Sequence, residues 1–581
     1  MKVTIMKKAN FKSAFSMLAL SIVAGLFFVS CSNSEDLSNE VTPKEGMGIV
    51  SFSINEKDYE PSENVTSTRA AAQSQPEIQD LGDGWQAEVS LVPDTTRRPE
   101  QKVATRAIYG NKHYTIRAYQ GSTLKGEIKG TFNGNNFTPD AGDPGVMQLP
   151  HGYYDFVCFN DYVTANGTTL SVNRTNQTNA YNAFYTIERG IHIYQDPKQK
   201  VSFTAKHAVA MVDVELQFVN CEIPMKVTST RYVFQPWGGG SAIYNTIEPQ
   251  DPNNKFQWRI HTGMNDIPEE MLYDFVTNTY TYPSMGQISS SNNKIGGEFQ
   301  NGGGTWVDMF LNTYYLLPST NCSKLKLTFD SGELYGRSLT GKSITVPTHK
   351  LVEANKRYKI SIRLIMENMY LFSDGTKGFL DKNPGKTAIG VILSPTNNFA
   401  VALKDVKVSG NDAIQWSSTT TQESSNPVGN YKDLFDISRF GTVSSSNIAM
   451  QAAQNMFGLR ATIPALYDFL IMGSSLGKMA NQGKGSQALG DYSFLIPEDA
   501  SATGFYPTPS AINFPMMDKS RFDAAFTRVN GDPMMGTYWT NTECKDGSEY
   551  KQVVVNVGGS QYSISLQPKN STAKIRPIIW F

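Results

Sequence analysis

Five residues in the last third of the 581-residue chain have side-chain types that bind sugars: Trp416, Tyr538, Trp539, Asn541 and Glu543. Aromatic rings stack on the apolar faces of sugar rings, while amides and carboxylates form hydrogen bonds with sugar hydroxyls. Large aromatic residues in strand patterns usually belong to the core. We therefore treat the five residues as a candidate ligand-binding site and keep the core as the alternative for the two tryptophans.

Catalytic and metal-binding patterns are weak in this sequence. None of the spacings Gly-x-Ser-x-Gly, His-Glu-x-x-His and Gly-x-x-x-x-Gly-Lys-Ser/Thr is convincing in its context, and none of the six histidines follows His349. Asp405, Asp433 and Asp436 do not form the clustered run of oxygen ligands that calcium requires. We expect a protein that is not an enzyme and that holds no cofactor or metal.

The charge balance argues against nucleic acid as a partner. Lys and Arg number 52 against 53 Asp and Glu, which gives a net charge of −1 at pH 7. A protein that binds the phosphate backbone needs surplus positive charge. Apolar residues make up 40% and charged residues 18%, with 47 glycines, which is typical of short strands joined by many turns. The composition predicts a mainly β protein of about three domains.

The first 30 residues have the layout of a secretory signal peptide. Lysines precede an uncharged apolar run at 14–29, which is shorter than the roughly 20 residues of a membrane-spanning helix. The run ends in Phe28-Val29-Ser30-Cys31, which resembles a bacterial lipobox and implies that Cys31 carries a lipid such as palmitate. The alternative is an ordinary cleaved signal with an incidental cysteine.

Residues 31–45 are polar and are expected to form a flexible tether between the lipid and the fold. The acidic stretch that directly follows Cys31 resembles the surface-export signal of Bacteroidetes lipoproteins. The resemblance implies a surface-exposed protein of the cell outer membrane.

Four further cysteines, Cys158, Cys221, Cys322 and Cys544, are widely spaced and include no Cys-x-x-Cys pair. In an oxidising compartment they allow three pairings, among which the sequence does not choose. Cys158 lies in an apolar run, so we expect a buried free thiol there.

Alternation of apolar and polar residues predicts strands across residues 46–367. Val50, Phe52 and Ile54 alternate with serines, which indicates a strand with one buried face. Regular strands at short spacing with Gly and Asn turns favour β-sandwiches, and we expect one at 46–200 and a second at 201–367. Residues 237–304 are expected to be long loops with brief strands. Further strands are predicted at 85–92, 113–119, 148–160, 201–218 and 357–365.

Residues 368–581 mix helical and strand patterns. Helices are predicted at 446–457 and 462–472, with Thr462 capping the second. We therefore expect an α+β domain at the end of the chain. Its strands are predicted at 537–542, 550–557, 562–566 and 573–580.

The first 365 residues resemble the fimbrillin family of Bacteroidetes, the subunits of type V pili. The resemblance rests on the lipobox, on a strand followed by an arginine at 49–70, and on the runs 149–157 and 355–360. It implies two β-sandwich domains whose first strand is removed by a trypsin-like protease after an arginine. A strand from the next subunit then fills the groove.

Carried to this chain, the fimbrillin resemblance makes Arg69 the candidate cleavage point and 49–54 the strand that leaves. Arg106 is the rival because it has the same Thr-Arg-Ala context. The alternative is that both are ordinary loop arginines.

Residues 369–581 are similar to the C-type-lectin-like domains at the C-termini of some bacterial adhesins. That family commonly has Leu-Pro-Thr and a Glu in its helix, whereas Ala465 replaces the Thr here and no Glu follows, which puts detailed functional transfer in doubt. The matching stretches are 374–376, 388–391, 402–405, 463–464, 538–543 and 574–578.

Together these resemblances imply a surface lipoprotein that acts as a fimbrial (pilus) subunit in cell adhesion. The last residues, 575–581, look committed to the sheet of the last domain, which favours the tip of the pilus. The implied partners are other pilus subunits, a glycan or host matrix protein, and the outer membrane. The main alternative is a lipid-anchored glycan-binding accessory protein of a polysaccharide uptake system, and an unrecognised hydrolase is a further rival.

Overall fold

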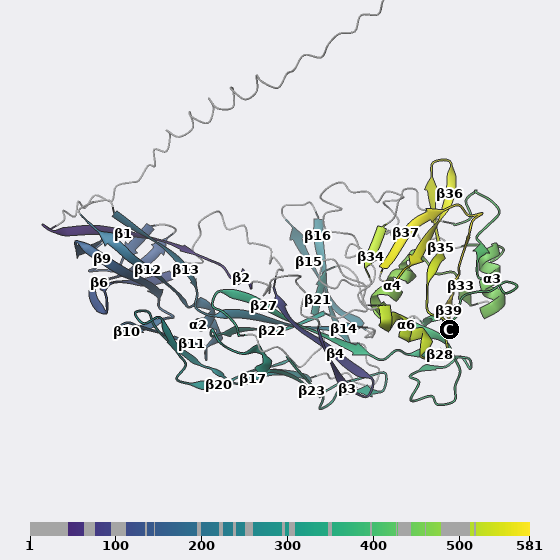
Figure 1. Ribbon diagram of the computed structural model, residues 1–581, viewed down its shortest axis with the longest axis horizontal. Helices are drawn as coiled ribbons and strands as arrows, with labels where there is room; N and C mark the ends of the chain where they lie inside the picture. The colour runs from purple at the N-terminus through teal and green to yellow at the C-terminus, as the bar shows by residue number, and fades with distance from the viewer. Residues whose placement is uncertain are drawn as a thin grey trace, which may run out of the picture.

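The computed structural model describes a mainly β protein built from three units (Figure 1), which confirms the predicted fold class. No helix in the described part of the chain is long and apolar enough to cross a bilayer. The described residues are 44–62, 76–94, 112–133, 136–144, 146–194, 199–219, 225–235, 240–249, 259–292, 297–300, 308–346, 351–394, 398–425, 427, 443–458, 460–477, 512–515, 519–559 and 561–581.

The first unit is a curled eight-stranded sheet. Its core takes residues from strands throughout the sheet, among them Val50, Ile116 and Phe156. The sheet curls so far that β6 lies against β8, where a Cβ on Gly126 would come 2.9 Å from Met147 Sδ. In spatial order the strands are β7 (Asn136–Pro139), β6 (Thr123–Asn133), β5 (Lys112–Gln120), β9 (Gly152–Asn160), β12 (Phe184–Ile193), β13 (Gln199–His207), β1 (Met47–Glu56) and β8 (Met147–Pro150).

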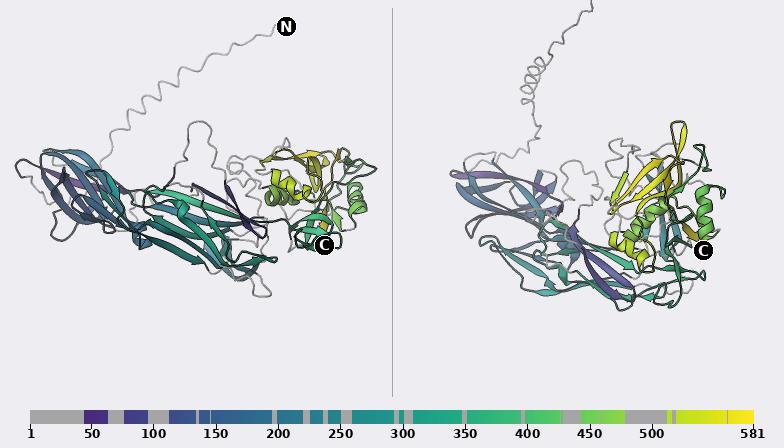
Figure 2. Two further views of the ribbon diagram at one scale, coloured as in Figure 1. Left: turned by 60° about the horizontal axis from the view of Figure 1, so that its bottom comes forward. Right: turned by 45° about the vertical axis from the view of Figure 1, so that its right-hand side comes forward.

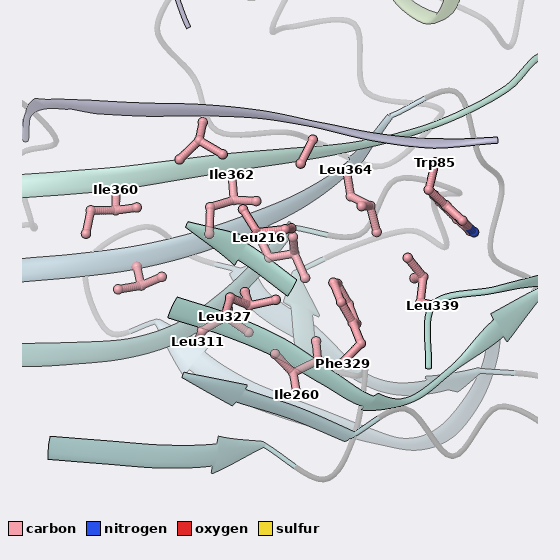
Figure 3. Packing of buried hydrophobic residues seen from close by; sticks show 14 of the residues in the cluster. Trp85, Leu216, Ile260, Leu311, Leu327, Phe329, Leu339, Ile360, Ile362 and Leu364 are labelled. Carbon is pink, nitrogen blue, oxygen red and sulfur yellow. The ribbon is translucent and has the colours of Figure 1, made fainter. Parts of the chain in front are cut away.

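The second unit is a sandwich of two sheets that share one core (Figure 3). Ile360 and Ile362 alternate along β27 and pack in the same cluster as Leu327 and Phe329 of the opposite sheet. The six-stranded sheet contains β22 (Asp308–Leu316), β14 (Ala210–Val219), β27 (Lys356–Met366), β4 (Trp85–Pro93) and β3 (Glu77–Gly82), with β2 (Glu60–Pro61) also paired to β27. The four-stranded sheet contains β20 (Met285–Asn292), β17 (Arg259–Pro268), β23 (Leu325–Ser331) and β26 (Ser343–Thr345).

Strands β2, β3 and β4 precede residue 200 but belong to the sheet of the second unit. β4 pairs with β27 from Trp85 beside Met366 to Pro93 beside Tyr358, and β3 pairs with β4. Conversely, β13 crosses residue 200 and pairs with β1 and β12 in the first sheet. The arrangement differs from the single boundary expected at residue 200, because alternation identifies the buried face of a strand but not the strand that lies beside it.

Smaller sheets complete these two units. A four-stranded sheet, called the bridging sheet below, shares a hydrophobic cluster with both units, through Val157 of β9, Tyr273 of its own and Met211 of β14. Its strands are β10 (Thr164–Asn166), β11 (Thr169–Asn173), β18 (Glu270–Asp274) and β19 (Thr279–Thr281). The remaining elements are α2 (Gln177–Asn182), β15 (Met225–Gln235), β16 (Gly240–Pro249), β21 (Gly297–Gln300), η1 (Cys322–Lys324), β24 (Glu333–Leu334) and β25 (Arg337–Ser338).

The third unit combines three described helices with two larger sheets and a two-stranded one. The helices are α3 (Ile448–Phe457), α4 (Leu466–Gly477) and α6 (Lys519–Thr527). One sheet contains β29 (Lys377–Gly378), β28 (Tyr370–Phe372), β30 (Ala388–Ser394), β31 (Phe399–Ala402), β39 (Ile578–Trp580) and β33 (Ala461–Thr462). The others contain β34 (Ile512–Pro515), β37 (Gln561–Gln567), β36 (Glu549–Val557) and β35 (Gly536–Asp546), and β32 (Ile414–Gln415) with β38 (Thr572–Ala573).

Both predicted helices of the third unit exist, but the second begins four residues later than its predicted cap. Thr462 lies in β33, so it does not cap α4. The N–H of Leu466 instead donates to Thr542 Oγ1 of β35 at 3.1 Å. A side chain from a distant strand thus replaces the local cap that the sequence suggests. Helix α6 was not predicted.

The second and third units meet across one continuous hydrophobic cluster. Leu371 of β28 belongs to the cluster that fills the second unit. Beside this cluster, the side chain of Arg337 is 2% exposed and contacts three carboxylates, those of Asp83 (3.0 Å), Glu367 (2.9 Å) and Asp381 (2.5 Å). We call this group the Arg337 clamp. Both views in Figure 2 show the third unit beside the second.

Candidate functional site

Strand β1 is held on both edges inside the first sheet. It runs parallel to β13, from Val50 beside Gln199 to Glu56 beside Ala205, and its first residues pair antiparallel with β8. The strand predicted at 49–55 is therefore confirmed. Removal of β1 would leave backbone donors and acceptors of both neighbours without partners, which is the situation of an unprotected sheet edge.

The inward face of β1 fills the core of the first unit. Val50, Phe52 and Ile54 are at most 3% exposed. The ring of Phe52 stacks on that of Phe203 and meets that of Phe156 edge-on, each at 5.9 Å between centroids. A sheet without β1 would therefore hold a groove lined by aromatic side chains.

The chain after β1 continues into the second unit. Tyr59 is buried, and its ring stacks on His207 at 3.8 Å between centroids. Directly after Tyr59, β2 pairs with β27, and Glu60 forms an ion pair with Lys356 at 3.1 Å. The segment 47–61 thus supplies a strand to both larger sheets.

The predicted modification sites, Cys31, Arg69 and Arg106, lie outside the described residues. The positions of the two arginines in the sequence still determine which strands a cut would separate. Arg69 falls between β2 and β3, and Arg106 falls between β4 and β5. A cut after Arg69 would separate β1 and β2 from the rest, whereas a cut after Arg106 would separate β3 and β4 as well.

The aromatic members of the candidate ligand-binding site lie in the interior of the third unit. Trp416, Tyr538 and Trp539 are each 0% exposed. Trp539 donates from Nε1 to Ile414 O at 2.7 Å, and its ring lies 5.9 Å from that of Trp416. A ring stacks on a sugar only where its face is accessible. The expected surface platform is therefore not formed by these rings, and both tryptophans are core residues.

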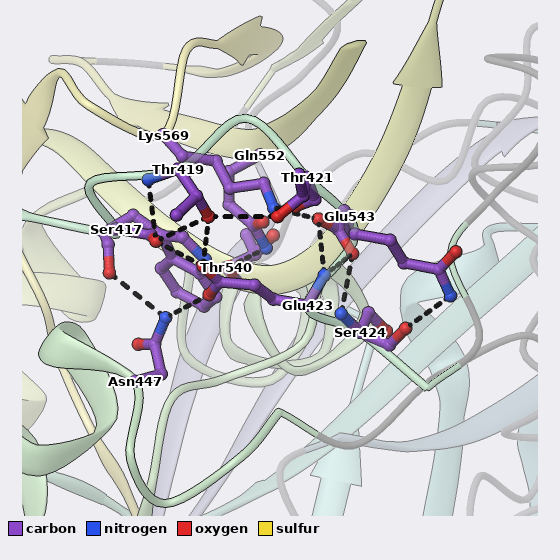
Figure 4. Close-up of polar contacts among 12 residues, drawn as sticks. Ser417, Thr419, Thr421, Glu423, Ser424, Asn447, Thr540, Glu543, Gln552 and Lys569 are labelled. Atoms are coloured by element: carbon purple, nitrogen blue, oxygen red, sulfur yellow. Dashed lines mark hydrogen bonds and ion pairs between the residues drawn. The ribbon is translucent and has the colours of Figure 1, made fainter. Parts of the chain in front are cut away.

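Glu543 is buried as well, and it anchors a loop. It forms an ion pair with Lys569, whose side chain is 0% exposed. Its carboxylate accepts the backbone N–H groups of Glu423 (3.1 Å) and Ser424 (2.7 Å), and Asn447 donates to Glu423 Oε2 at 2.6 Å (Figure 4). These bonds fasten the loop after β32 onto β35 and the start of α3. The role of Glu543 in this structure is therefore structural.

Asn541 is the partly exposed member of the predicted set. Its backbone N–H donates to Pro464 O at 2.8 Å, and its Oδ1 has no hydrogen-bond partner among the described residues. Asp405, which was considered for calcium, pairs with Arg576 at 2.6 Å. Within the described part of the chain, no group of three His, Cys, Asp or Glu side chains could hold a metal ion.

Two further sequence features are also structural. Residues 473–477 have Gly-x-Ser-x-Gly spacing, but they lie inside α4 with Ser475 at 3% exposed, so no strand-to-helix turn presents that serine. Cys158 is a buried free thiol, as expected, and Cys322 and Cys544 are buried as well. Burial raises the pKa of Cys158 well above its usual value, so it stays protonated at neutral pH.

A cleft that sequence reasoning missed lies between the first sheet and the bridging sheet. Its volume is about 690 Å³, and its lining includes Tyr185 of β12 together with Tyr273 and Tyr280. We call it the tyrosine cleft. Tyr273 and Tyr280 lie within 237–304, where mainly loops were expected, and Tyr185 lies far from that stretch along the chain. The alternation Thr279-Tyr280-Thr281-Tyr282 was the one available signal, because it is typical of a strand with an exposed aromatic face.

His207 is a buried lining residue of the tyrosine cleft, and its ring lies 3.8 Å from that of Tyr59 and 4.1 Å from that of Phe184. Burial, helped by the charge of Lys112, lowers the pKa of His207 to about 3, although a hydrogen bond with Tyr181 O opposes the shift. The imidazole is therefore neutral at physiological pH.

The last strand, β39, lies inside its sheet. It pairs with β31 through Ala400 beside Ile579, and with β33 through Ala461 beside Ile579. The prediction that residues 575–581 belong to the sheet of the last domain is confirmed for Ile578–Trp580.

Neither a protein-family model nor a curated protein matches this chain. Its structure is similar to that of a candidate cell adhesion protein from Bacteroides uniformis, with 15% identity over 44% of this chain and 88% of the other, at a TM-score of 0.27. A second such protein, from Bacteroides ovatus, shares 10% identity over 54% and 91%, with a TM-score of 0.27. A fimbrilin from Porphyromonas gingivalis shares 11% identity over 55% and 97%, with a TM-score of 0.24. At these scores, none of the similarities assigns the chain to a family.

Proposed function

We propose that the chain is a surface lipoprotein of fimbrial type that assembles by exchange of strand β1. The observation that carries the proposal is the place of β1. This strand fills the first core with Phe52 and pairs on both edges, and Arg69 follows β1 and the short β2 before β3 begins. Proteolysis after that arginine would free a strand whose groove accepts another strand of the same alternation.

The continuation of β1 into β2 extends the acceptor groove. Loss of 47–61 would free the edge of β13 in the first sheet and uncover part of β27 in the second. A donor strand long enough to follow both would bury two sets of apolar positions and join the units. Arg69 suits this outcome better than Arg106, because a cut after Arg106 would also free β4, whose Trp85 is 0% exposed in the second core.

The position of β39 supports a place at the tip. A strand that pairs with β31 and β33 cannot be offered to another subunit unless the sheet of the third unit opens. The chain would accept a donor strand at β1 and offer none from β39. Under this proposal the third unit, which resembles a C-type-lectin-like domain, faces away from the fibre and carries adhesion.

Cleavage and assembly can be tested on cells that express the full chain. We expect Arg69→Ala to keep the precursor length and to abolish incorporation into fibres. Arg97→Ala, in the separate polar region between β4 and β5, should have no effect. N-terminal sequencing of the mature subunit should give Ala70. A mature start at Ala107 would move the cut to Arg106, and fibres with an intact N-terminal segment would refute strand exchange.

The groove itself can be tested with a peptide that has the sequence of β1, residues 47–56. We expect this peptide to bind the cleaved protein and block its incorporation, whereas a scrambled peptide of equal composition should do neither. A Cys31→Ser variant should leave the membrane fraction. A chain that stays lipid-anchored, uncleaved and monomeric yet binds glycans would favour the accessory protein of a polysaccharide uptake system.

A further inference from the structure

The tyrosine cleft has the composition of a carbohydrate site, and we propose that it binds a short carbohydrate. Its volume of about 690 Å³ lies within the usual range for small-molecule pockets, about 300–1,000 Å³. The inference goes beyond the proposed assembly function and does not depend on the exchange of β1. It rests on three features of the cleft: an accessible aromatic face, free polar groups, and a rigid frame.

The aromatic face is provided by Tyr280. Its side chain is 45% exposed, and its ring stacks on that of Tyr273 at 4.4 Å between centroids, with 13° between the ring planes. Tyr273 in turn lies 5.8 Å from Tyr185 of the first sheet. The inner two rings fix the orientation of the outer one, which can then stack on the C–H face of a sugar at little entropic cost. The buried tryptophans of the third unit offer no such face.

Polar groups at the rim can bond sugar hydroxyls. Asn278 accepts a hydrogen bond from Tyr273 at 2.9 Å through Oδ1, so its amide nitrogen can donate to a ligand. Thr204 and Lys206 alternate on the outward face of β13 and line the opposite wall. Glu188 lines the cleft beside them. The cleft therefore offers donors and acceptors of both kinds around one aromatic face, which suits a polyhydroxylated ligand better than an apolar one.

The frame of the cleft is held in place before any ligand arrives. Arg189 forms an ion pair with Asp155 at 3.2 Å and donates to the carbonyl of Phe275, which ties the bulge of β12 to the turn between β18 and β19. In that turn, Asp274 Oδ1 accepts the N–H of Val276 at 2.9 Å. These bonds hold the two walls at a fixed separation, so little conformational freedom remains to be lost on binding.

The test uses the full-length chain on a glycan array that includes neutral, amino and acidic oligosaccharides, followed by calorimetry with the strongest ligand. We expect Tyr280→Ala to weaken binding at least tenfold, and Tyr280→Trp, which keeps an aromatic face, to retain it. The matched control is Tyr153→Ala, which removes a 66% exposed tyrosine of β9 that does not line the cleft and should bind as the parent does.

A second variant keeps the test decisive if Tyr280→Ala fails to fold. Asn278 has φ of +56°, a conformation that glycine adopts freely, so Asn278→Gly removes the amide without straining the turn. It should lower affinity while leaving the melting temperature unchanged. No binding to any array member, or full binding by both Tyr280→Ala and Asn278→Gly, would overturn the inference. Fibre formation, scored separately, should be normal in both variants, so its loss would bear on β1 exchange instead.

Discussion

Aromatic residues are buried in the third unit but accessible in the tyrosine cleft. In the third unit, Trp416 and Trp539 are completely buried, and the indole N–H of Trp539 donates a hydrogen bond to a backbone carbonyl. In the cleft, Tyr280 is half exposed, although its strand β19 alternates threonine and an aromatic residue much as β35 does. The difference comes from position. Both β35 and β19 are edge strands of their sheets, but Trp539 packs in a core cluster with residues of α3 and β32, whereas Tyr280 lines an open cleft.

The comparison is tested most strongly by Trp539→Ala. If the ring is core, its loss leaves a cavity and should lower the free energy of unfolding by about 3–5 kcal/mol. Trp580→Ala is the matched control in the same unit, because Trp580 is 45% exposed and should cost much less. Chemical denaturation of the full chain measures both. Equal effects of the two substitutions would contradict the burial of Trp539.

Within the third unit, buried and exposed ion pairs should differ in the same way as buried and exposed aromatic residues. Lys569→Met would leave the carboxylate of Glu543 without its cation, and we expect a loss of about 3 kcal/mol in the free energy of unfolding. The double variant Lys569→Met/Glu543→Gln should recover part of it, as a double-mutant cycle would show. Lys551→Met breaks the exposed pair with Asp546 and should cost under about 1 kcal/mol. If Lys569→Met lowered the free energy of unfolding as little as Lys551→Met does, the result would argue against a buried ion pair.

In the lining of the cleft, His207 should make stability depend on pH. The unfolded chain takes up a proton on this imidazole near pH 6.5, roughly the ordinary value, whereas the folded chain does so only near pH 3. The free energy of unfolding should therefore fall as the pH drops through that window, by about 1.4 kcal/mol per pH unit from this group. His207→Phe, which keeps the stacking on Tyr59, should flatten the slope relative to the exposed control His192→Gln. An unchanged slope would contradict the buried neutral imidazole.

The smallest expected effect belongs to Tyr280→Ala. Because the ring is half exposed, its loss should change the free energy of unfolding by no more than about 0.5 kcal/mol, even as it removes the proposed binding face. Thermal melting beside the binding assay checks this. A large drop in melting temperature would place Tyr280 among the core residues and erase the contrast with Trp539.

Local patterns predicted the strands better than their partners. The strict alternation at 357–365 gave β27 to within a residue at each end, because one buried face repeats every second residue. The same rule could not show that β3 and β4 cross into the second sheet. It also could not bring Tyr185 and Tyr280 to one cleft, because their proximity depends on how two sheets pack. Trp539 shows a further limit, since its residue type suits a binding site and a core equally well.

The Arg337 clamp determines how a mechanical load would pass through the molecule. The third unit is joined to the second by a shared core and by Arg337, whose partner Glu367 directly follows β27. Tension applied to the third unit would therefore enter β27 along its length. Because β27 is bonded to β14 on one side and to β4 on the other, the pull would load both rows of hydrogen bonds in shear. The junction would therefore transmit torque between the second and third units and would not let them rotate freely.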